Sequence, residues 1–321
     1  MLQEIFDKNR DIVINSDIDG FLCGMLLQKY YSCRVVGFSN SWDCVWLSKE
    51  YEDTIGEDAV NKPVYIDLYV VNPDVICIEQ HIIGYDDKHN AAIKALGTKV
   101  NPNIMRHGRT FTGDYFHKYP FGTVHFLIAM MEREGITVEL PLLLNSNTLK
   151  TLEYNLTIGD ILLRADDALF SSLGPYKANA EEWWPWLVEF SNSAKSVFAM
   201  TNYVGQQDPG KRFIVKDRTA DYFKKEFGCD GIDGAYKYVT DVNGVIFDKI
   251  LLYRDEISKL MDMPLSLPKN YNIHKGIAST CKYTGNADNL TPDRWRELYS
   301  YAFIFGPRSP KNNFSYTINM K

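Results

Sequence analysis

Short runs of consecutive apolar residues, many of them β-branched, alternate with segments of helical periodicity along the first 100 residues. Runs without polar alternation indicate strands that are covered on both faces, which is typical of a parallel sheet. The sequence therefore predicts an α/β fold in which ligands bind beyond the carboxyl ends of the strands. The expected strands are 11–15, 34–38, 63–67, 75–79 and 98–100.

The spacing of apolar residues predicts helices between and after these strands, at 20–31, 91–96, 121–134, 142–163 and 181–197. A Gly- and Pro-containing stretch at 201–210 is expected to be a loop and a domain boundary. Beyond it we expect strands at 212–215, 244–252 and 313–318, and a helix at 219–227. The sequence thus predicts a parallel-sheet domain over 1–195 and a smaller mixed α/β domain over 205–321.

The composition is that of an ordinary globular chain, with 45% hydrophobic and 24% charged residues, and it excludes a fibrous or disordered protein. A net charge of −6 argues against a general cationic nucleic-acid coat. The charge is uneven, since residues 271–321 carry seven Lys or Arg and only three acids. An acidic body with a basic end suits metal ions at one place and a phosphate-bearing ligand at another.

The six cysteines show no CxxC pairing, so we expect reduced thiols. No apolar stretch approaches the roughly 18 residues of a membrane-spanning helix. The first 15 residues also lack the layout of a signal peptide. Together these features predict a cytoplasmic protein without a membrane partner.

The segment Asn15-Ser16-Asp17-Ile18-Asp19-Gly20 stands at a strand-to-helix turn. Two carboxylates at this spacing can point into one pocket, and hard cations such as Mn²⁺ and Mg²⁺ prefer several oxygen ligands. The alternative is an Asx-turn that caps the following helix, a position where Asp and Asn are also favoured.

Two further polar groups follow strands of the same expected sheet. Asp67 ends one apolar run, and Glu79-Gln80-His81 ends the next. Because the carboxyl ends of parallel strands meet at one edge, we expect these groups to converge with Asp17 and Asp19.

In order and spacing these residues resemble the DHH phosphoesterase superfamily, which includes RecJ-like exonucleases, nanoRNases, cyclic-dinucleotide phosphodiesterases and family II pyrophosphatases. Its first motif resembles Asp17-Ile18-Asp19-Gly20, its second Asp67, and its Asp-His-His motif Glu79-Gln80-His81. The fourth acidic motif is best matched by Asp166 or Asp167, and less well by Asp160. The resemblance covers about residues 10–175.

The resemblance implies a two-metal site for phosphoester hydrolysis. Asp67 would bridge the ions and Asp17 would bind one of them. Asp19, His81 and Asp166 or Asp167 would surround the other, and the ions would activate a water molecule. Asp67 and His81 are thus the expected catalytic residues, with Asn15, Glu79 and Gln80 as further ligands or supporting groups.

The chain also departs from the family pattern. Gln80 stands where the family has a metal-binding histidine, and its neutral amide is a poorer donor to Mn²⁺ than an imidazole. The histidine that many members carry before the paired aspartates is missing, and the glycine-rich motif of the C-terminal domain is not found. His89 could be recruited as a ligand, although a surface position is the alternative.

Basic segments could contact phosphate groups of a substrate. Arg106, His107 and Arg109 follow the fifth expected strand, and Arg308 and Lys311 lie in a polar turn near the C-terminus. In both cases an ordinary exposed loop is the alternative. The tryptophans at 183, 184 and 186 could stack on bases, or could equally pack in the core.

The sequence therefore predicts a Mn²⁺-dependent hydrolase with one or two ions, with Mg²⁺ as the other candidate. The expected substrate is a phosphodiester in a nucleotide or a short single-stranded nucleic acid. The alternative is a catalytically eroded protein that binds a nucleotide or a protein partner. Inorganic pyrophosphatase is a third interpretation, and the sequence is compatible with a homodimer.

Overall fold

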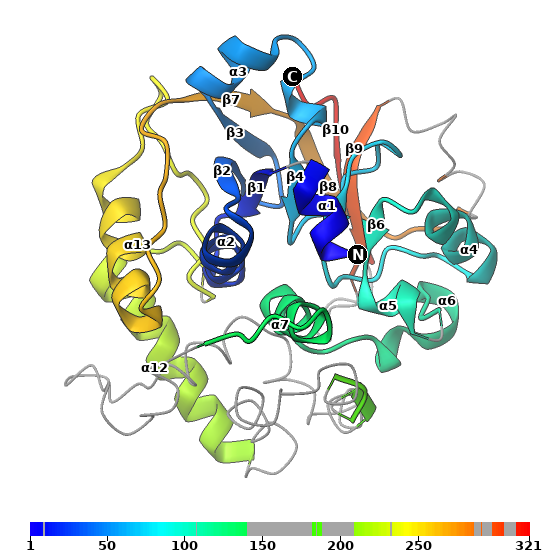
Figure 1. Ribbon diagram of the computed structural model, residues 1–321. Coiled ribbons are helices and arrows are strands. Elements are labelled where there is room, and N and C mark those ends of the chain that lie inside the picture. The colour runs from blue at the N-terminus through cyan, green and yellow to red at the C-terminus, as the bar shows by residue number, and fades with distance from the viewer. Residues whose placement is uncertain are drawn as a thin grey trace.

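The computed structural model describes residues 1–8, 10–106, 108–139, 182–183, 185–187, 209–231, 233–285, 290, 297–304 and 313–321. Its centre is a seven-stranded sheet (Figure 1). The strands are β1 (Asp11–Asn15), β2 (Arg34–Ser39), β3 (Cys44–Ser48), β4 (Val64–Ile66), β5 (Cys77–Ile78), β6 (Lys99–Val100) and β7 (Tyr271–Lys275). They are arranged in the order β6-β5-β4-β1-β2-β3-β7. The first five strands in this order pair in parallel. Strand β3 pairs antiparallel with β2, and β7 pairs antiparallel with β3.

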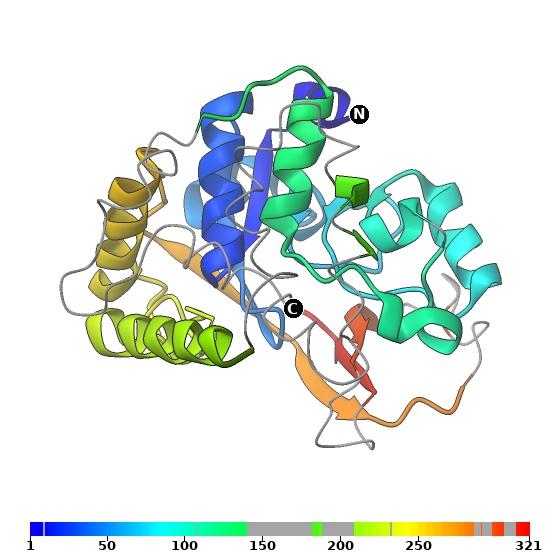
Figure 2. The same ribbon diagram turned by 90° about the horizontal axis from the view of Figure 1, so that it is seen from below.

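Helices cover both faces of this sheet. Their bounds are α1 (Leu2–Lys8), α2 (Ile18–Tyr31), α3 (Lys49–Ile55), α4 (Asp87–Leu96), α5 (Pro102–Met105), α6 (Phe111–Asp114), α7 (Thr123–Arg133), α12 (Pro209–Phe227) and α13 (Asp248–Met261). Short 3₁₀ helices occupy Ala59–Asn61 and Tyr115–His117. Helices α2 and α7 lie side by side against one face, with α12 and α13 beyond α2 (Figures 1 and 2).

Strand β1 shows why the sheet is buried on both sides. Ile12 and Ile14 belong to the core beneath α2 and α7, whereas Val13 between them belongs to a second core on the opposite face. All three are completely buried. A strand with two apolar faces cannot alternate apolar and polar residues, and this explains the continuous apolar run in the sequence.

A separate three-stranded antiparallel sheet follows in the C-terminal part. Its strands β8 (Ile277–Cys281), β9 (Leu298–Phe303) and β10 (Phe314–Ile318) have the order β8-β10-β9. Its inner face packs aromatic rings of Tyr301, Phe303 and Phe314 against residues 69–115 of the N-terminal part. Residues after 205 therefore supply both the small sheet and the edge strand β7 of the large one.

The α/β class, the mostly parallel sheet and its first five strands are confirmed. The prediction of strands at 212–215 and 244–252 is wrong. The first range lies inside α12, which begins with Pro209, a residue suited to the first helical turn. In the second, Gly244 makes a turn at φ +80°, and helix α13 starts at Asp248.

Strands β3 and β7 were not expected. They depend on the turn after β2, in which the Asn40 side-chain oxygen accepts three backbone N–H groups, from Trp42, Asp43 and Cys44, each at 3.0 Å. The helix expected at 142–163, the loop at 201–208 and most of 181–197 lie outside the described residues.

All six cysteines are free thiols, as the sequence predicts; five of them are buried and Cys281 is exposed. Among the described helices, none is both long and apolar enough to cross a membrane.

Candidate active site at the carboxyl edge of the parallel sheet

The strand order places a topological switch point between β1 and β4. The parallel strands run β2-β1-β4-β5-β6, so successive connections turn outward in opposite directions from β1 and β4. Ligands of open α/β sheets bind at this point, outside the carboxyl ends of the strands. Asp17 follows β1 there, and Asp67 follows β4.

One amide group joins these two carboxylates. The Asn15 Nδ2 donates to Asp17 Oδ2 at 2.7 Å and to Asp67 Oδ2 at 3.0 Å. The hydroxyl of Thr123, the first residue of α7, donates to Asp67 Oδ1 at 2.7 Å. Asp67 has φ +63°, a left-handed conformation that Asp tolerates better than most residues. Asn15, Asp67 and Thr123 are all buried.

Burial raises the pKa of Asp17 well above its usual range, and the neighbouring charges of Asp67 and Asp233 raise it further. Burial also raises the pKa of Asp67, against the opposing effects of His81 and of the hydrogen bond from Asn15. Two buried carboxylates so close together repel each other. The pair therefore favours a bound cation, or a shared proton in its place.

The structure places Asp19 differently from Asp17. Its carboxylate accepts the backbone N–H groups of Thr123 and Val124, both at 2.7 Å, at the start of α7. A carboxylate is stabilised at this end of a helix, where the N–H groups lack partners within the helix. Asp17 also caps a helix, since its Oδ1 accepts the N–H of Gly20 at 2.9 Å. The capping alternative is therefore confirmed for Asp17, which also contacts Asn15 of the site, whereas Asp19 lies within α2 and caps α7 instead.

Gly20 is required by the same turn. A Cβ atom at this position would clash with the backbone of Asn15. The Asp-x-Asp-Gly pattern is thus explained locally by two helix-terminal carboxylates and one close approach between backbone segments.

Glu79, Gln80 and His81 form a tight loop after β5. The Glu79 carboxylate is buried and accepts the backbone N–H of His81 at 2.6 Å and the side-chain amide of Asn101. Asn103 donates to the Gln80 carbonyl oxygen at 2.7 Å. The Glu79 carboxylate therefore holds this loop in place through hydrogen bonds to the His81 N–H and to Asn101.

His81 is the member of this loop that faces the aspartates. Its side chain is 36% exposed, and its Nδ1 lies 3.5 Å from Glu79 Oε2. Burial opposes protonation of the ring, but the contact with Glu79 and the charge of Asp67 outweigh it and raise the pKa of His81. The positive charge of Lys118 acts in the opposite direction, which places that side chain within electrostatic range.

Gln80 carries a buried polar atom in this neighbourhood. The residue is only 7% exposed, and its Oε1 finds no hydrogen-bond donor among the described residues. Its Nε2 lies 3.4 Å from His81 Nε2. A buried carbonyl oxygen normally has a partner, so this oxygen is suited to an added donor or a cation.

Residues from the C-terminal part close the site from another side. The Ser16 hydroxyl donates to the Tyr236 carbonyl oxygen at 2.7 Å, and the Tyr236 N–H donates to the Ser16 carbonyl oxygen at 2.9 Å. The N–H of Ile18 donates to the Asp233 carbonyl oxygen at 3.3 Å. Sequence reasoning missed Asp233 and Lys118, since neither follows a predicted strand of the sheet.

The expected phosphate-binding arginines contact a segment far away in the sequence. Arg106 donates to the Glu182 carbonyl oxygen at 3.0 Å, and its guanidinium lies over the rings of Trp183 and Trp186. Arg109 pairs with the Glu182 carboxylate. Trp183 is fully buried, so the packing alternative is confirmed for this tryptophan.

His89 is not a surface residue, as one alternative had it. It is buried on α4, where its Nδ1 accepts the N–H of Tyr85 at 3.1 Å. Burial lowers the pKa of His89 to about 4. Of the other expected site residues, His107, Asp160, Asp166, Asp167, Arg308 and Lys311 lie outside the described residues, as does Trp184.

The donor set is incomplete as a metal cage. Within the described ranges, no group of three His, Cys, Asp or Glu side chains could hold an ion. Asp17 and Asp67 offer two carboxylates with uncompensated charge, and Gln80 offers a neutral oxygen. Hard cations accept such oxygen ligands, so these residues suit one cation, the smaller of the two numbers expected from the sequence.

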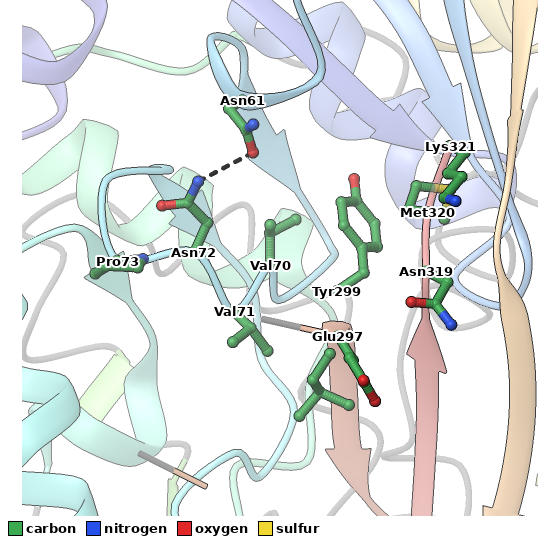
Figure 3. A pocket seen from close by; sticks show the side chains of 11 residues that line it. Asn61, Val70, Val71, Asn72, Pro73, Glu297, Tyr299, Asn319, Met320 and Lys321 are labelled. Atoms are coloured by element: carbon green, nitrogen blue, oxygen red, sulfur yellow. Dashed lines mark hydrogen bonds between the residues drawn. The ribbon is translucent and has the colours of Figure 1, made fainter. Parts of the chain in front are cut away.

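A cavity of about 400 Å³ lies between the loop after Asp67 and the small sheet (Figure 3). Asn72 donates to Asn61 at 3.1 Å on its wall. Beneath it the buried Lys99 amine donates to the carbonyl oxygens of Val70 at 2.9 Å and Asn72 at 2.7 Å, and so shapes the loop. None of the expected site residues lines this cavity.

Comparisons with models of protein families, with curated proteins and with solved structures gave no match to this chain.

Proposed function

We propose that this protein is a metal-dependent phosphoesterase that hydrolyses a phosphodiester in a nucleotide or a short single-stranded nucleic acid. The observation that carries the proposal is the pair of the half-buried Asp17 and the buried Asp67 at the switch point, bridged by one amide of Asn15. An anionic pair of this kind suits a hard cation, and the location is where open α/β sheets bind ligands.

Asp17 and Asp67 would hold a divalent cation, with Mn²⁺ as the first candidate and Mg²⁺ as the second. Such an ion polarises a phosphoryl oxygen and lowers the pKa of a bound water molecule. Asn15 and Thr123 fix the orientation of Asp67 through their hydrogen bonds. Further ligands from Asp166 or Asp167 remain part of the proposal.

His81 is suited to handle a proton. It is partly exposed next to Asp67, and its raised pKa keeps a proton on the ring at a higher pH than usual. A protonated imidazole can donate to the leaving oxygen of a phosphoester as a general acid. Glu79 holds the ring in place through the backbone and Nδ1 of His81.

Hydrolysis of a substrate panel tests this proposal. The panel contains a short labelled RNA, a short DNA, linear and cyclic dinucleotides and pyrophosphate, each with Mn²⁺, Mg²⁺ or EDTA. Metal-dependent cleavage should be lost in Asp67→Asn and kept in Asp58→Asn, which changes an exposed aspartate. Cleavage that persists fully in Asp67→Asn would refute the assigned site.

A second candidate is a binding protein whose metal site has eroded. It is favoured by the engagement of Asp19 with α7 and by Gln80 at the expected place of a histidine. Such a protein would bind a nucleotide in EDTA and would turn over no member of the panel. Equilibrium binding of a labelled dinucleotide, measured beside the hydrolysis assay, separates the two functions.

A further inference from the structure

Two cationic side chains of the segment 106–117, Arg109 and His117, converge on the carboxylate of Glu182. The Glu182 Oε1 pairs with the Arg109 guanidinium, and its Oε2 lies 3.0 Å from His117 Nδ1. Arg106 donates to the backbone oxygen of the same residue. The His117 side chain is 54% exposed, that of Glu182 26% and that of Arg109 15%, so solvent reaches this cluster mainly from the side of His117.

This cluster is linked directly to the candidate active site. The Arg109 N–H donates to the Asn103 carbonyl oxygen at 2.8 Å, and the Asn103 side chain donates to the Gln80 carbonyl oxygen at 2.7 Å. Lys118, the residue after His117, is within electrostatic range of His81. The segment from α5 to the 3₁₀ helix at Tyr115–His117 thus carries both the support of the Gln80-His81 loop and the cationic cluster.

The segment around Glu182 is anchored by its neighbour. Trp183 is fully buried, its Nε1 donates to the His117 carbonyl oxygen at 2.8 Å, and its ring packs against Tyr119 at 5.4 Å. Arg106 lies over the Trp183 ring at 5.0 Å. Because this packing holds the backbone, the Glu182 side chain can rotate away without moving the segment.

We propose that Arg109 and His117 form a subsite for a terminal phosphate group, and that the Glu182 carboxylate occupies this subsite as an internal competitor. The planar arginine fork recognises phosphate and carboxylate in the same way. A phosphate carries more charge and more acceptor oxygens than a carboxylate, so it can displace the side chain. Arg106 is the positioning residue that holds the Glu182 backbone in place.

The class of ligand, a short oligonucleotide with a terminal phosphate, rests on the proposed function. Its inner phosphodiester would lie at Asp17 and Asp67, and its terminal phosphate at Arg109. Glu182 would then set how strongly the site prefers phosphorylated ends. A ligand without a terminal phosphate gains nothing from displacing the carboxylate.

The test is equilibrium binding in EDTA, where no metal-dependent turnover occurs. The probes are a dinucleotide with a terminal phosphate, the same dinucleotide without it, and inorganic phosphate. Glu182→Gln should bind the phosphorylated probe and inorganic phosphate about tenfold more tightly than the unsubstituted protein. It should bind the unphosphorylated probe equally well, and Arg109→Gln should lose the preference for the phosphorylated probe.

Glu134→Gln is the matched control. Glu134 is another partly buried glutamate in an ion pair, accepting from the N-terminal amine and from the N–H of Leu2, both at 2.7 Å. It should leave phosphate binding unchanged, and thermal melting confirms that each variant is folded. If Arg109→Gln does not fold, Glu182→Gln still tests the inference, because this variant is expected to bind phosphate more tightly.

Equal phosphate affinity in Glu182→Gln and the unsubstituted protein would overturn the inference, as would weaker binding in the variant. Inorganic phosphate separates this outcome from failure of the proposed function. If no dinucleotide is cleaved with Mn²⁺ or Mg²⁺ in the substrate panel but Glu182→Gln still gains affinity for inorganic phosphate, the subsite stands and the phosphodiesterase proposal falls.

Discussion

Acidic residues follow three neighbouring strands of one sheet, yet they divide into two kinds. Asp17 and Asp67 accept hydrogen bonds from the same side-chain amide, and the charge of Asp67 adds to the burial that raises the pKa of Asp17. Asp19 and Glu79 accept backbone N–H groups and hold a helix and a loop in place. Asp19 shares features of both kinds, because burial and the charges of Asp67 and Asp17 raise its pKa even though it accepts two N–H groups of α7.

The largest effect is expected from a substitution in the pair of Asp17 and Asp67. Asp67→Asn should lower metal-dependent hydrolysis by at least about two orders of magnitude, since it removes a ligand charge from the proposed site. Stability should stay the same or rise, because the substitution relieves repulsion between two buried carboxylates and Asn tolerates a positive φ. Activity assays and thermal melting of the same preparation measure both. A variant that is active but unstable would assign Asp67 to the scaffold.

Asp19→Ala tests the other kind of acid. It leaves two N–H groups at the start of α7 without their carboxylate, so we expect a loss of about 2 kcal/mol in the free energy of unfolding. Urea denaturation measures this loss, and the folded fraction should retain its hydrolytic activity. Unchanged stability together with lost activity would move Asp19 into the group of Asp17 and Asp67.

Glu79→Gln should lower the free energy of unfolding by about 1 kcal/mol. The neutral amide still accepts one hydrogen bond, but it weakens the charge-assisted contacts with the His81 N–H and with Asn101. The variant should also shift the alkaline limb of the pH–activity profile to lower pH, since Glu79 helps to raise the pKa of His81, whose protonated ring is the proposed general acid. A pH profile identical to that of the unsubstituted protein would separate Glu79 from His81 in function.

The smallest effect concerns the buried histidine of α4, His89. His89 is buried with a pKa lowered to about 4, so the unfolded chain binds a proton more readily than the folded one. Its contribution to stability is complete above pH 6.5 and is lost as the pH falls toward 4. We expect His89→Gln to reduce the drop in unfolding free energy between pH 7 and pH 5.5 by about 1 kcal/mol. The same drop in both proteins would contradict this assignment.

The parallel sheet could be predicted because its strands are continuous apolar runs, and their order gave the edge at which Asp17 and Asp67 meet. Strands β3 and β7 could not, because their pairing depends on a polar turn and on residues more than 200 positions apart. The hydrogen-bond donors to Asp19 could not be predicted either. They are backbone N–H groups of α7, whose contact with Asp19 has no pattern in the sequence.

The same limit explains why the contacts of the two arginines could not be predicted. Arg106 and Arg109 were predicted from charge alone, and that pattern says nothing about Glu182, more than 70 residues away. Lys118 and Asp233 reach the site by tertiary packing rather than from strand ends. Sequence periodicity identifies the edge of the sheet, but the contents of a pocket depend on which distant loops return to that edge.

The contacts of Ser16 with Tyr236, and of Ile18 with Asp233, have a consequence for synthesis of the chain. The turn that carries Asp17 is made first, but its partners leave the ribosome more than 200 residues later. Strand β7, which covers the outer side of β3, follows later still. The turn that carries Asp17 is thus synthesised long before the residues that it contacts, and the site is completed only when the last third of the chain has emerged.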